Sequence, residues 1–265
     1  MRAPEPALKA AIEDTMREAG ALAKAKFQTD LKTWSKDGGS PVSEADIAVD
    51  NFLRTQLMQL APDCGWLSEE TEDDRARLRA QRVWVVDPID GTRAYLSGRH
   101  DWSISVALVE DGRPAIAAIF APMQDALYAA AAGADTTLNG AAVTANGGAG
   151  FEGIVAAGPK SMLERLAHHA PTMTLEPKVF SLALRLARVA AGTLDLAFAS
   201  ANSHDWDLAA ADLLVHQAGG ALTTFTGQKL IYNRADPLHG ALVAAGQLRH
   251  EAFLALVRAR TLAFA

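Results

Sequence analysis

The sequence predicts a layered α/β protein with an antiparallel sheet in its first half. Three segments there, residues 102–109, 114–120 and 126–131, are rich in apolar residues and are separated by short turns. Consecutive strands joined by short turns form an antiparallel meander. After residue 150, strand-like and helix-like segments alternate, which is typical of sheets packed against helices.

The region before this sheet is predicted to be mainly helical. Residues 7–27 place apolar side chains at helical spacing after two prolines, and residues 43–60 show the same spacing. Between them, residues 32–41 contain two glycines and a proline, which indicates a mobile loop. The strongly charged residues 71–81 are expected to form a solvated helix or loop.

The second half contains further predicted strands and helices in alternation. The strands are expected at residues 154–157, 194–198, 221–225 and 241–245. The helices are expected at residues 161–168, 182–191, 206–218 and 248–261. A stretch rich in glycine, alanine and asparagine predicts a boundary between two halves, residues 1–138 and residues 139–265.

Composition limits the possible partners and the compartment. The 265 residues suffice for one large domain or two closely joined ones. The formal net charge is −6 and Lys and Arg do not cluster, so we expect no nucleic-acid partner. Cys64 is the single cysteine, which excludes an intramolecular disulfide and fits a reducing compartment. Residues 1–9 lack the apolar core of a secretory signal, and no apolar run approaches the roughly 18 residues that span a bilayer. We therefore expect a cytoplasmic protein without a membrane partner.

A strand-like run at residues 83–86 leads into the most informative motif, Asp87-Pro88-Ile89-Asp90-Gly91-Thr92. The strand is expected to stop at the first aspartate, because Pro88 lacks a backbone N–H. Gly91 would let the backbone approach a ligand closely. A helix that begins near Thr92 would direct free N–H groups at an anion such as phosphate. The alternative is a plain strand-to-helix turn in which Asp90 caps the helix.

Two aspartates beside an anion-binding turn are electrostatically compatible with the anion when a cation lies between them. Carboxylate oxygens are hard ligands that select Mg²⁺, Mn²⁺ or Ca²⁺, and Mg²⁺ is the usual partner of phosphate. The motif therefore predicts a metal-assisted phosphate site around Asp87 and Asp90.

Further acidic residues could join this site, and each has a structural alternative. Glu69 and Glu70 follow an apolar pair, but they could equally begin a solvated acidic stretch. Asp207 lies at the start of a predicted helix, where acidic residues also act as caps. Asp46 lies three residues after Ser43, a spacing typical of a capping box.

Two runs together resemble the signatures of the inositol monophosphatase family. The first is the motif at residues 87–92, and the second is Trp206-Asp207-Leu208-Ala209-Ala210-Ala211 followed by Gly219-Gly220. The resemblance extends from about residue 7 to the C-terminus, and the family includes bisphosphate nucleotidases and a histidinol-phosphatase branch. It implies a layered α-β-α-β-α sandwich of the inositol monophosphatase and fructose-1,6-bisphosphatase type.

The resemblance also implies a site that holds two or three Mg²⁺ ions. The implied metal ligands are Glu69, Asp87, the carbonyl oxygen of Ile89, Asp90 and Asp207. Asp46 and Thr92 would orient and deprotonate a metal-bound water that attacks a small-molecule phosphate ester. The implied substrate-binding residues are Asp90, Gly91, Thr92, Arg93 and Ser200. Two interpretations of Lys36 stay open at this point: it is a site residue or a solvated lysine.

The resemblance leaves the substrate open. Ser200 stands where inositol-specific members usually carry Glu, and Arg93 stands where nucleotidase and histidinol-phosphatase relatives often carry Lys or Arg. The implied substrate is inositol monophosphate or 3′-phosphoadenosine 5′-phosphate. The alternatives are a histidinol-phosphate phosphatase and a catalytically silent regulatory relative that binds metal and ligand. Inhibition by Li⁺ and a homodimer are also implied.

Overall fold

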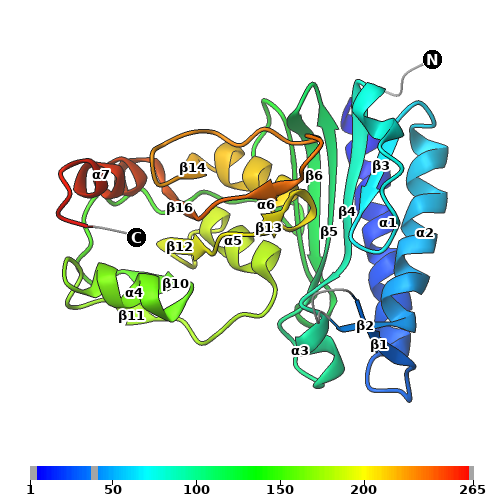
Figure 1. Cartoon of the computed structure of the whole chain (residues 1–265), viewed down its shortest axis with the longest axis horizontal. Helices are drawn as coiled ribbons and strands as arrows, with labels where there is room; N and C mark the ends of the chain where they lie inside the picture. The colour runs from blue at the N-terminus through cyan, green and yellow to red at the C-terminus, as the bar shows by residue number, and fades with distance from the viewer. Residues whose placement is uncertain (1–4, 37–40, 263–265) are drawn as a thin grey trace.

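The computed structural model describes residues 5–36 and 41–262, which fold into alternating layers of helices and strands (Figure 1). Along the long axis the layers are α1 with α2, a seven-stranded sheet, α5 with α6, a five-stranded sheet, and α4 with α7. The helix bounds are α1 Glu5–Lys26, α2 Glu44–Leu60, α4 Lys160–Ala167, α5 Leu182–Ala190, α6 Asp205–Gln217 and α7 Gln247–Arg258. The predicted α-β-α-β-α sandwich is confirmed, and so are these six helices.

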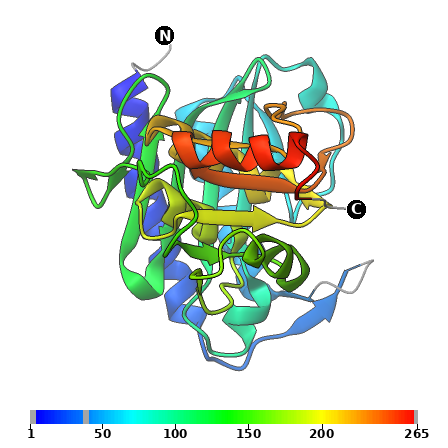
Figure 2. The same ribbon diagram turned by 90° about the vertical axis from the view of Figure 1, so that its left-hand side faces the viewer.

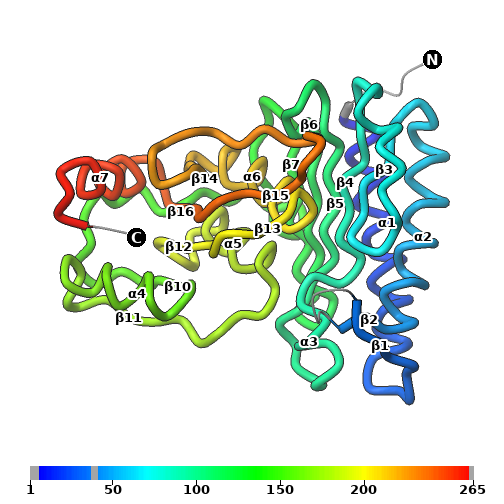
Figure 3. The backbone as a smooth tube through the Cα atoms, in the orientation of Figure 1, coloured from blue at the N-terminus to red at the C-terminus, as the bar shows by residue number. Residues whose placement is uncertain are grey.

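The first sheet is the predicted meander with strands added at both edges. Its order is β3 Gly65–Ser68, β4 Arg82–Asp90, β5 Ser103–Glu110, β6 Arg113–Ala121, β7 Ala126–Ala131, β8 Thr137–Leu138 and β9 Ala141–Ala142. All neighbouring pairs are antiparallel except β3 and β4, which run parallel. Figure 3 shows β3 to β7 side by side, with α1 and α2 on one side of the sheet.

Helical spacing explains why α1 and α2 pack on this sheet. In α1, Leu8, Ile12 and Met16 recur at intervals of four residues and are fully or almost fully buried. In α2, Val49 and Leu53 complete the same apolar cluster, which also contains side chains of β4 to β7. Burial of this stripe, rather than intrinsic helix propensity, fixes the two helices on the sheet.

The strand β4 extends beyond the predicted stop at Asp87 and includes the whole Asp-Pro-Ile-Asp run. Asp87 pairs with Ser105 and Asp90 pairs with Ser103, so β4 carries one extra residue and bulges between the two aspartates. A bulge tolerates Pro88, because the extra residue leaves the ladder of backbone hydrogen bonds. The expectation that proline ends the strand was wrong for this reason.

The second sheet is mixed and lies in the second half of the chain. Its order is β11 Thr174–Leu175, β10 Val155–Ala157, β12 Leu196–Ala199, β16 Leu242–Gly246 and β14 Gly220–Thr224. Side chains of α5 and α6 fill the space between the two sheets, whereas α4 and α7 cover the opposite face of the second sheet. Figure 2 shows α7 lying over β16 on that outer face.

The segment between the two sheets is packed rather than loose. Ala145 donates a backbone hydrogen bond of 2.9 Å to the carbonyl of Ala218 at the end of α6. A Cβ atom added to Gly246 would lie 1.9 Å from the carbonyl oxygen of Asn146, so the two backbones touch there. The predicted division into residues 1–138 and 139–265 stays a prediction.

Residues 32–41 are more ordered at both ends than the predicted loop. β1 Thr33–Ser35 and β2 Pro41–Ser43 form an antiparallel pair in which Trp34 faces Val42. Residues 37–40, which include both glycines of that loop, lie outside the described residues. The pair places Lys36 close to the end of β3, as described below.

The charged segment at residues 71–81 is not fully solvated, contrary to expectation. A short 3₁₀ turn, Ala76–Arg79, buries the Arg77 side chain almost completely. Its guanidinium forms two hydrogen bonds to Asp73, of 3.0 and 2.7 Å, and donates to Asn233 and to the Arg234 carbonyl. A cation can be buried there because each of these contacts compensates for lost hydration.

Cys64 is buried, as a small apolar side chain would be. Within residues 5–36 and 41–262, no helix combines the length and the apolar character that crossing a bilayer requires.

Candidate active site

Three carboxylates from distant parts of the chain meet at one point. Asp87 and Asp90 come from the bulged end of β4, and Asp207 comes from the first turn of α6. Each offers a carboxylate oxygen, and these oxygens lie within 4.8 Å of one another. The bulge turns both β4 aspartates toward α6, and α6 reaches them because it packs across the sheet.

These carboxylates line a cavity of about 300 Å³. Its other walls come from the short helix α3 Thr92–Leu96, from the end of β3, and from the segment before α5. The lining residues are Pro41, Glu69, Asp87, Asp90, Gly91, Thr92, Arg93, Lys178, Phe180 and Asp207. Most of the residues predicted for the site therefore share one cavity.

Asp90 joins the two halves of the molecule through α5. Its carboxylate accepts hydrogen bonds from the Ser181 hydroxyl and the Ala183 N–H, both 2.6 Å, and from the Leu182 N–H at 3.2 Å. Ser181 is the N-cap of α5 and also bonds to Ser103 of β5. Sequence reasoning missed this contact. The available signal was a serine directly before the helical residues 182–191, but nothing in the chain indicated that Asp90 would reach it.

Asp46 and Thr92 form a second, connected pair. The Thr92 hydroxyl lies 3.1 Å from an Asp46 carboxylate oxygen and 3.1 Å from the Ile89 carbonyl oxygen. The other oxygen of Asp46 accepts from the backbone N–H and the hydroxyl of Ser43, which completes a capping box at the start of α2. Asp46 is fully buried, so the capping and functional interpretations of this residue are compatible.

The acidic turn after β3 brings Glu69 to the same cavity, and Lys36 lies against this turn. The Lys36 ammonium lies 3.0 Å from the Glu69 carbonyl oxygen, 3.4 Å from the Glu69 carboxylate and 2.6 Å from the Glu70 carboxylate. Lys36 is therefore a member of the site's surroundings rather than a solvated lysine. Its part in catalysis stays a prediction.

A side chain of α2 holds this turn in place through hydrogen bonds. Asp50, almost fully buried, accepts a hydrogen bond from the Ser68 hydroxyl and another of 2.7 Å from the Thr71 hydroxyl. The Ser68 oxygen in turn accepts from the Glu70 N–H at 3.3 Å. Two buried carboxylates of one helix, Asp46 and Asp50, thus contact the two segments that carry the predicted ligands.

The electrostatics of the cluster disfavour three bare carboxylates side by side. Burial raises the pKa of Asp87 well above its ordinary value, and the charges of Glu69 and Asp90 raise it further. Burial raises the pKa of Asp90 to about 6, against the opposing effect of its three hydrogen-bond donors. Burial and the charge of Asp90 also raise the pKa of Asp207 well above its ordinary value. A hard divalent cation relieves this repulsion and matches the all-oxygen donor set.

Gly91 shapes the backbone turn next to the carboxylates. Its φ of +93° lies in the left-handed region, and a Cβ there would come within 3.1 Å of the Ser181 nitrogen. The left-handed conformation therefore favours glycine here, and a Cβ would in addition make a tight contact. Directly after it, α3 begins at Thr92, and Arg93 extends exposed at the cavity wall.

Ser200 is a predicted site residue that the structure places in a different cavity. It is exposed and lines a neighbouring cavity of about 600 Å³ between α4, the segment before α5 and the end of β12. Its contact with substrate stays a prediction. Asp205, beside Asp207, is fully buried and bonds to His239 at 2.7 Å and to the Asn233 N–H at 2.7 Å.

Comparisons with known proteins agree with this fold and identify the family. The model of the inositol monophosphatase family matches residues 4–262. A histidinol-phosphatase from Mycobacterium tuberculosis is 31% identical over 254 residues, which cover 91% of this chain and 94% of the relative. A 3′-phosphoadenosine 5′-phosphate phosphatase from Mycobacterium bovis is 32% identical over 200 residues, 72% of this chain and 72% of the relative.

A solved structure shows the same architecture. The extragenic suppressor protein SuhB from Bartonella henselae superposes with a TM-score of 0.83 at 24% identity, covering 95% of this chain and 98% of that one. The matching family model and the cluster of acidic residues are those of a family of metal-dependent phosphatases. More particularly, the chain belongs to the inositol monophosphatase family.

Proposed function

We propose that this protein is a Mg²⁺-dependent phosphomonoesterase that hydrolyses a small phosphorylated metabolite. The observation that supports this most directly is the convergence of Asp87, Asp90 and Asp207 within 4.8 Å. We assign Glu69 and the Ile89 carbonyl oxygen to the same ligand set, for two or three ions in all. Bound Mg²⁺ would lower the pKa of a water molecule and stabilise the leaving oxygen of the ester.

The chain's own contribution to proton transfer lies with Thr92 and Asp46. The Thr92 hydroxyl donates to the buried Asp46 carboxylate at 3.1 Å, so its oxygen can accept a proton from water as its own proton moves to Asp46. Burial raises the pKa of Asp46 above its ordinary value, although hydrogen bonds from Ser43 act in the opposite direction. A more basic carboxylate holds that proton better.

We assign the phosphate group to the turn at Gly91 and Thr92. The first N–H groups of α3 have no partner within the helix, and Gly91 keeps the backbone open to the cavity. We assign Arg93 to the same region, where its exposed guanidinium can contact a phosphate oxygen or a group on the leaving alcohol.

The candidate substrates are inositol monophosphate and 3′-phosphoadenosine 5′-phosphate, with histidinol phosphate as the alternative. The relatives differ in the activity that their names give, so membership of the family does not choose among the three. A second alternative is a regulatory relative that binds metal and ligand without turnover.

The test is phosphate release from a panel of these three compounds, with Mg²⁺ and with a chelator. We expect Mg²⁺-dependent release from at least one of them by the wild-type protein. Asp87→Asn keeps the side-chain shape but removes one charge, and it should lower kcat by at least about 10³-fold. It should also abolish the rise in Tm on adding Mg²⁺ while raising the Tm of the metal-free protein, because repulsion is relieved.

The matched control is Asp125→Asn, an exposed carboxylate remote from the cavity, which should behave as wild type. Inactivity of the wild-type protein on every compound, with Mg²⁺ binding retained, would favour the regulatory alternative. Asp90→Asn is a less clean variant, because Asp90 also holds the start of α5.

We also propose a cytoplasmic homodimer that Li⁺ inhibits. Light scattering during size-exclusion chromatography measures the assembly, and the phosphate-release assay with added LiCl measures the inhibition. Both properties follow from family resemblance alone, so neither result affects the assignment of the acidic site.

A further inference from the structure

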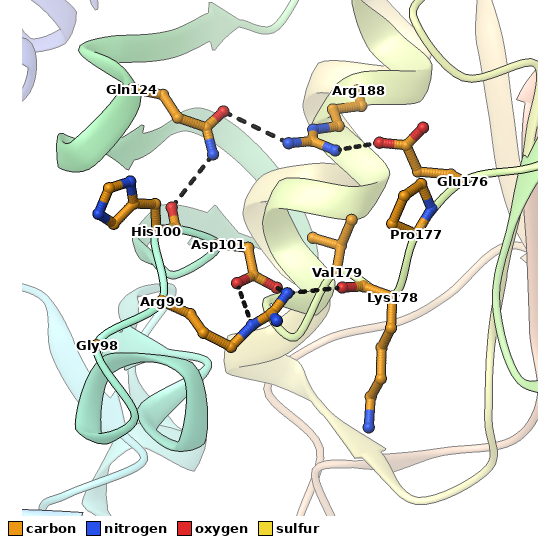
Figure 4. A pocket seen from close by; sticks show the side chains of 10 residues that line it. All are labelled: Gly98, Arg99, His100, Asp101, Gln124, Glu176, Pro177, Lys178, Val179 and Arg188. Carbon is orange, nitrogen blue, oxygen red and sulfur yellow. Dashed lines mark hydrogen bonds and ion pairs between the residues drawn. The ribbon is translucent and has the colours of Figure 1, made fainter.

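One lysine connects the acidic cavity to its larger neighbour. Lys178, in the segment between β11 and α5, is exposed and lines both the cavity of the carboxylates and the cavity of about 600 Å³. It also borders a third cavity, of about 470 Å³, whose lining is drawn in Figure 4. A group leaving the acidic cavity toward Ser200 therefore passes this side chain.

The structure fixes where the Lys178 ammonium lies. Figure 4 shows the side chain pointing away from the hydrogen-bonded pair of Arg99 and Asp101 and away from Arg188, which bonds to Glu176. The ammonium instead lies 4.2 Å from the ring centroid of Phe180. The Phe180 N–H bonds to Asp101 at 2.8 Å, so this aromatic platform is itself held in place. A cation over an aromatic face keeps its charge available to an anion on its other side.

The charges around the 600 Å³ cavity do not cancel. Glu164 is 3.7 Å from Lys160, and Glu176 is 2.8 Å from Arg188, so both acids have a cationic partner. Arg185 donates to the Phe198 and Val179 carbonyl oxygens, which fix its position without neutralising it. Across residues 5–36 and 41–262, neither Lys178 nor Arg185 has a carboxylate at ion-pair distance. These two cations give the cavity an excess of positive charge.

The remaining wall of the cavity is largely apolar. Leu163, Ala167, Met173 and Leu175 line it on the side of α4 and β11. Its volume of about 600 Å³ lies within the range of pockets that enclose cofactor-sized and drug-sized ligands. The cavity thus combines apolar surface for a ring or hydrocarbon body with cations at the side nearest the carboxylates.

From this arrangement we propose that Lys178 is a specificity-determining residue which binds a second anionic group on the leaving alcohol. The preferred substrates are phosphomonoesters whose apolar body carries a further phosphate or comparable anion. The scissile phosphate lies in the acidic cavity and the body lies in the 600 Å³ cavity. This inference rests on the proposed phosphatase function, since it concerns the leaving group of the same reaction.

The test compares two substrates that share a body and differ in the second anion: 3′-phosphoadenosine 5′-phosphate and adenosine 3′-monophosphate. Wild type should have a kcat/KM at least about tenfold higher for the bisphosphate, since a charged hydrogen bond contributes that much or more. Lys178→Met should raise KM for the bisphosphate about tenfold and leave kcat, and both constants for the monophosphate, within about twofold. Lys178→Arg should restore most of the affinity.

Lys229→Met, a change at an exposed lysine outside these cavities, is the matched control and should leave both substrates unaffected. The proposal is overturned if wild type shows no preference for the bisphosphate, or if Lys178→Met affects both substrates equally. It is also overturned if the protein hydrolyses inositol monophosphate but neither nucleotide, although the phosphatase function then stands. Absence of Mg²⁺-dependent release from every phosphate ester contradicts the proposed function itself.

Discussion

Burial shifts the pKa values of the acidic Asp90 and the basic His250 in opposite directions. It raises the pKa of Asp90 to about 6, because the charged carboxylate loses hydration. It lowers the pKa of His250 to about 4, because the charged imidazolium loses hydration. His250 lies almost fully buried on α7, with its Nε2 atom 2.9 Å from the Thr223 hydroxyl. Burial therefore favours the protonated, neutral form of Asp90 and the unprotonated, neutral form of His250.

His250 should make folding stability depend on pH. Its pKa is lower in the folded state than in the unfolded chain, so the unfolded state binds more protons between about pH 4 and 6.5. The stability from neutral, buried His250 is present above pH 6.5 and is lost as the pH falls toward 4. Between pH 7 and pH 5 the wild type should lose about 2 kcal/mol more than His250→Gln.

Urea unfolding at both pH values measures this difference. The exposed His168→Gln variant controls for removal of an imidazole as such. Equal losses in wild type and His250→Gln between the two pH values would show that His250 is not the source of the acid sensitivity.

At the scale of elements, α2 acts as a support for the site rather than as a cover for the sheet alone. The face of α2 that points away from the sheet is solvated, but Asp46 and Asp50 lie on the inner face and are buried. Asp46 contacts Thr92 at the start of α3, and Asp50 contacts Ser68 and Thr71 around the acidic turn. One helix therefore sets the relative position of the two predicted ligand segments.

Replacing Asp50 with Asn should weaken Mg²⁺ binding without removing a ligand. The amide nitrogen cannot accept a hydroxyl proton, so one of the two bonds that hold the turn at Glu69 is lost. Loss of a residue that orients a ligand lowers metal affinity by about 10- to 100-fold. Calorimetric titration with Mg²⁺ measures this change directly.

Asn51→Ala, on the exposed side of the same helix, is the control for helix stability and should bind Mg²⁺ as wild type. Unchanged affinity in Asp50→Asn, with normal folding, would remove Asp50 from the support of the site.

The elements also show what the sequence could predict. The spacing of Leu8, Ile12 and Met16 depends on local chain geometry, so α1 was predicted correctly. The meander was predictable for the same reason, since its turns are short. The end of β4 was not, because the bulge exists only in register with β5. The burial of Arg77 depends on Asn233, 156 positions away, and no local pattern reports such a partner.

The candidate site likewise has features that the sequence could predict and features that it could not. Asp87 and Asp90 lie in one motif, and their shared cavity could be inferred from it. The contact of Asp90 with Ser181, and the cavity that Lys178 shares with the carboxylates, depend on how α5 docks against the sheet. Ser200 was assigned from its position in the chain, and the structure places it in the neighbouring cavity.

At the scale of the whole molecule, the two sheets are joined by a segment that fits tightly against the second sheet. Gly246, at the end of β16, meets the Asn146 backbone so closely that a Cβ would lie 1.9 Å from its carbonyl oxygen. Because the obstacle is backbone rather than a flexible side chain, relief requires the connecting segment to move.

Gly246→Ala should therefore destabilise the protein by about 3 kcal/mol, at the upper end of the range for overpacking. Chemical unfolding measures this loss. Gly240→Ala is the matched control, because an added Cβ there meets nothing within 4 Å, and it should change stability little. A Gly246→Ala variant as stable as wild type would mean that the segment near Asn146 shifts without cost.

Asp90 is held by the first residues of α5, and Asp207 arrives on α6, more than a hundred residues after the β4 motif. A ribosome releases the β4 aspartates long before either helix exists. We therefore expect nascent chains that end before residue 180 to carry an unfinished acidic pair. The cluster of three carboxylates is then complete only after Asp207 has been synthesised and α6 has docked on the sheet.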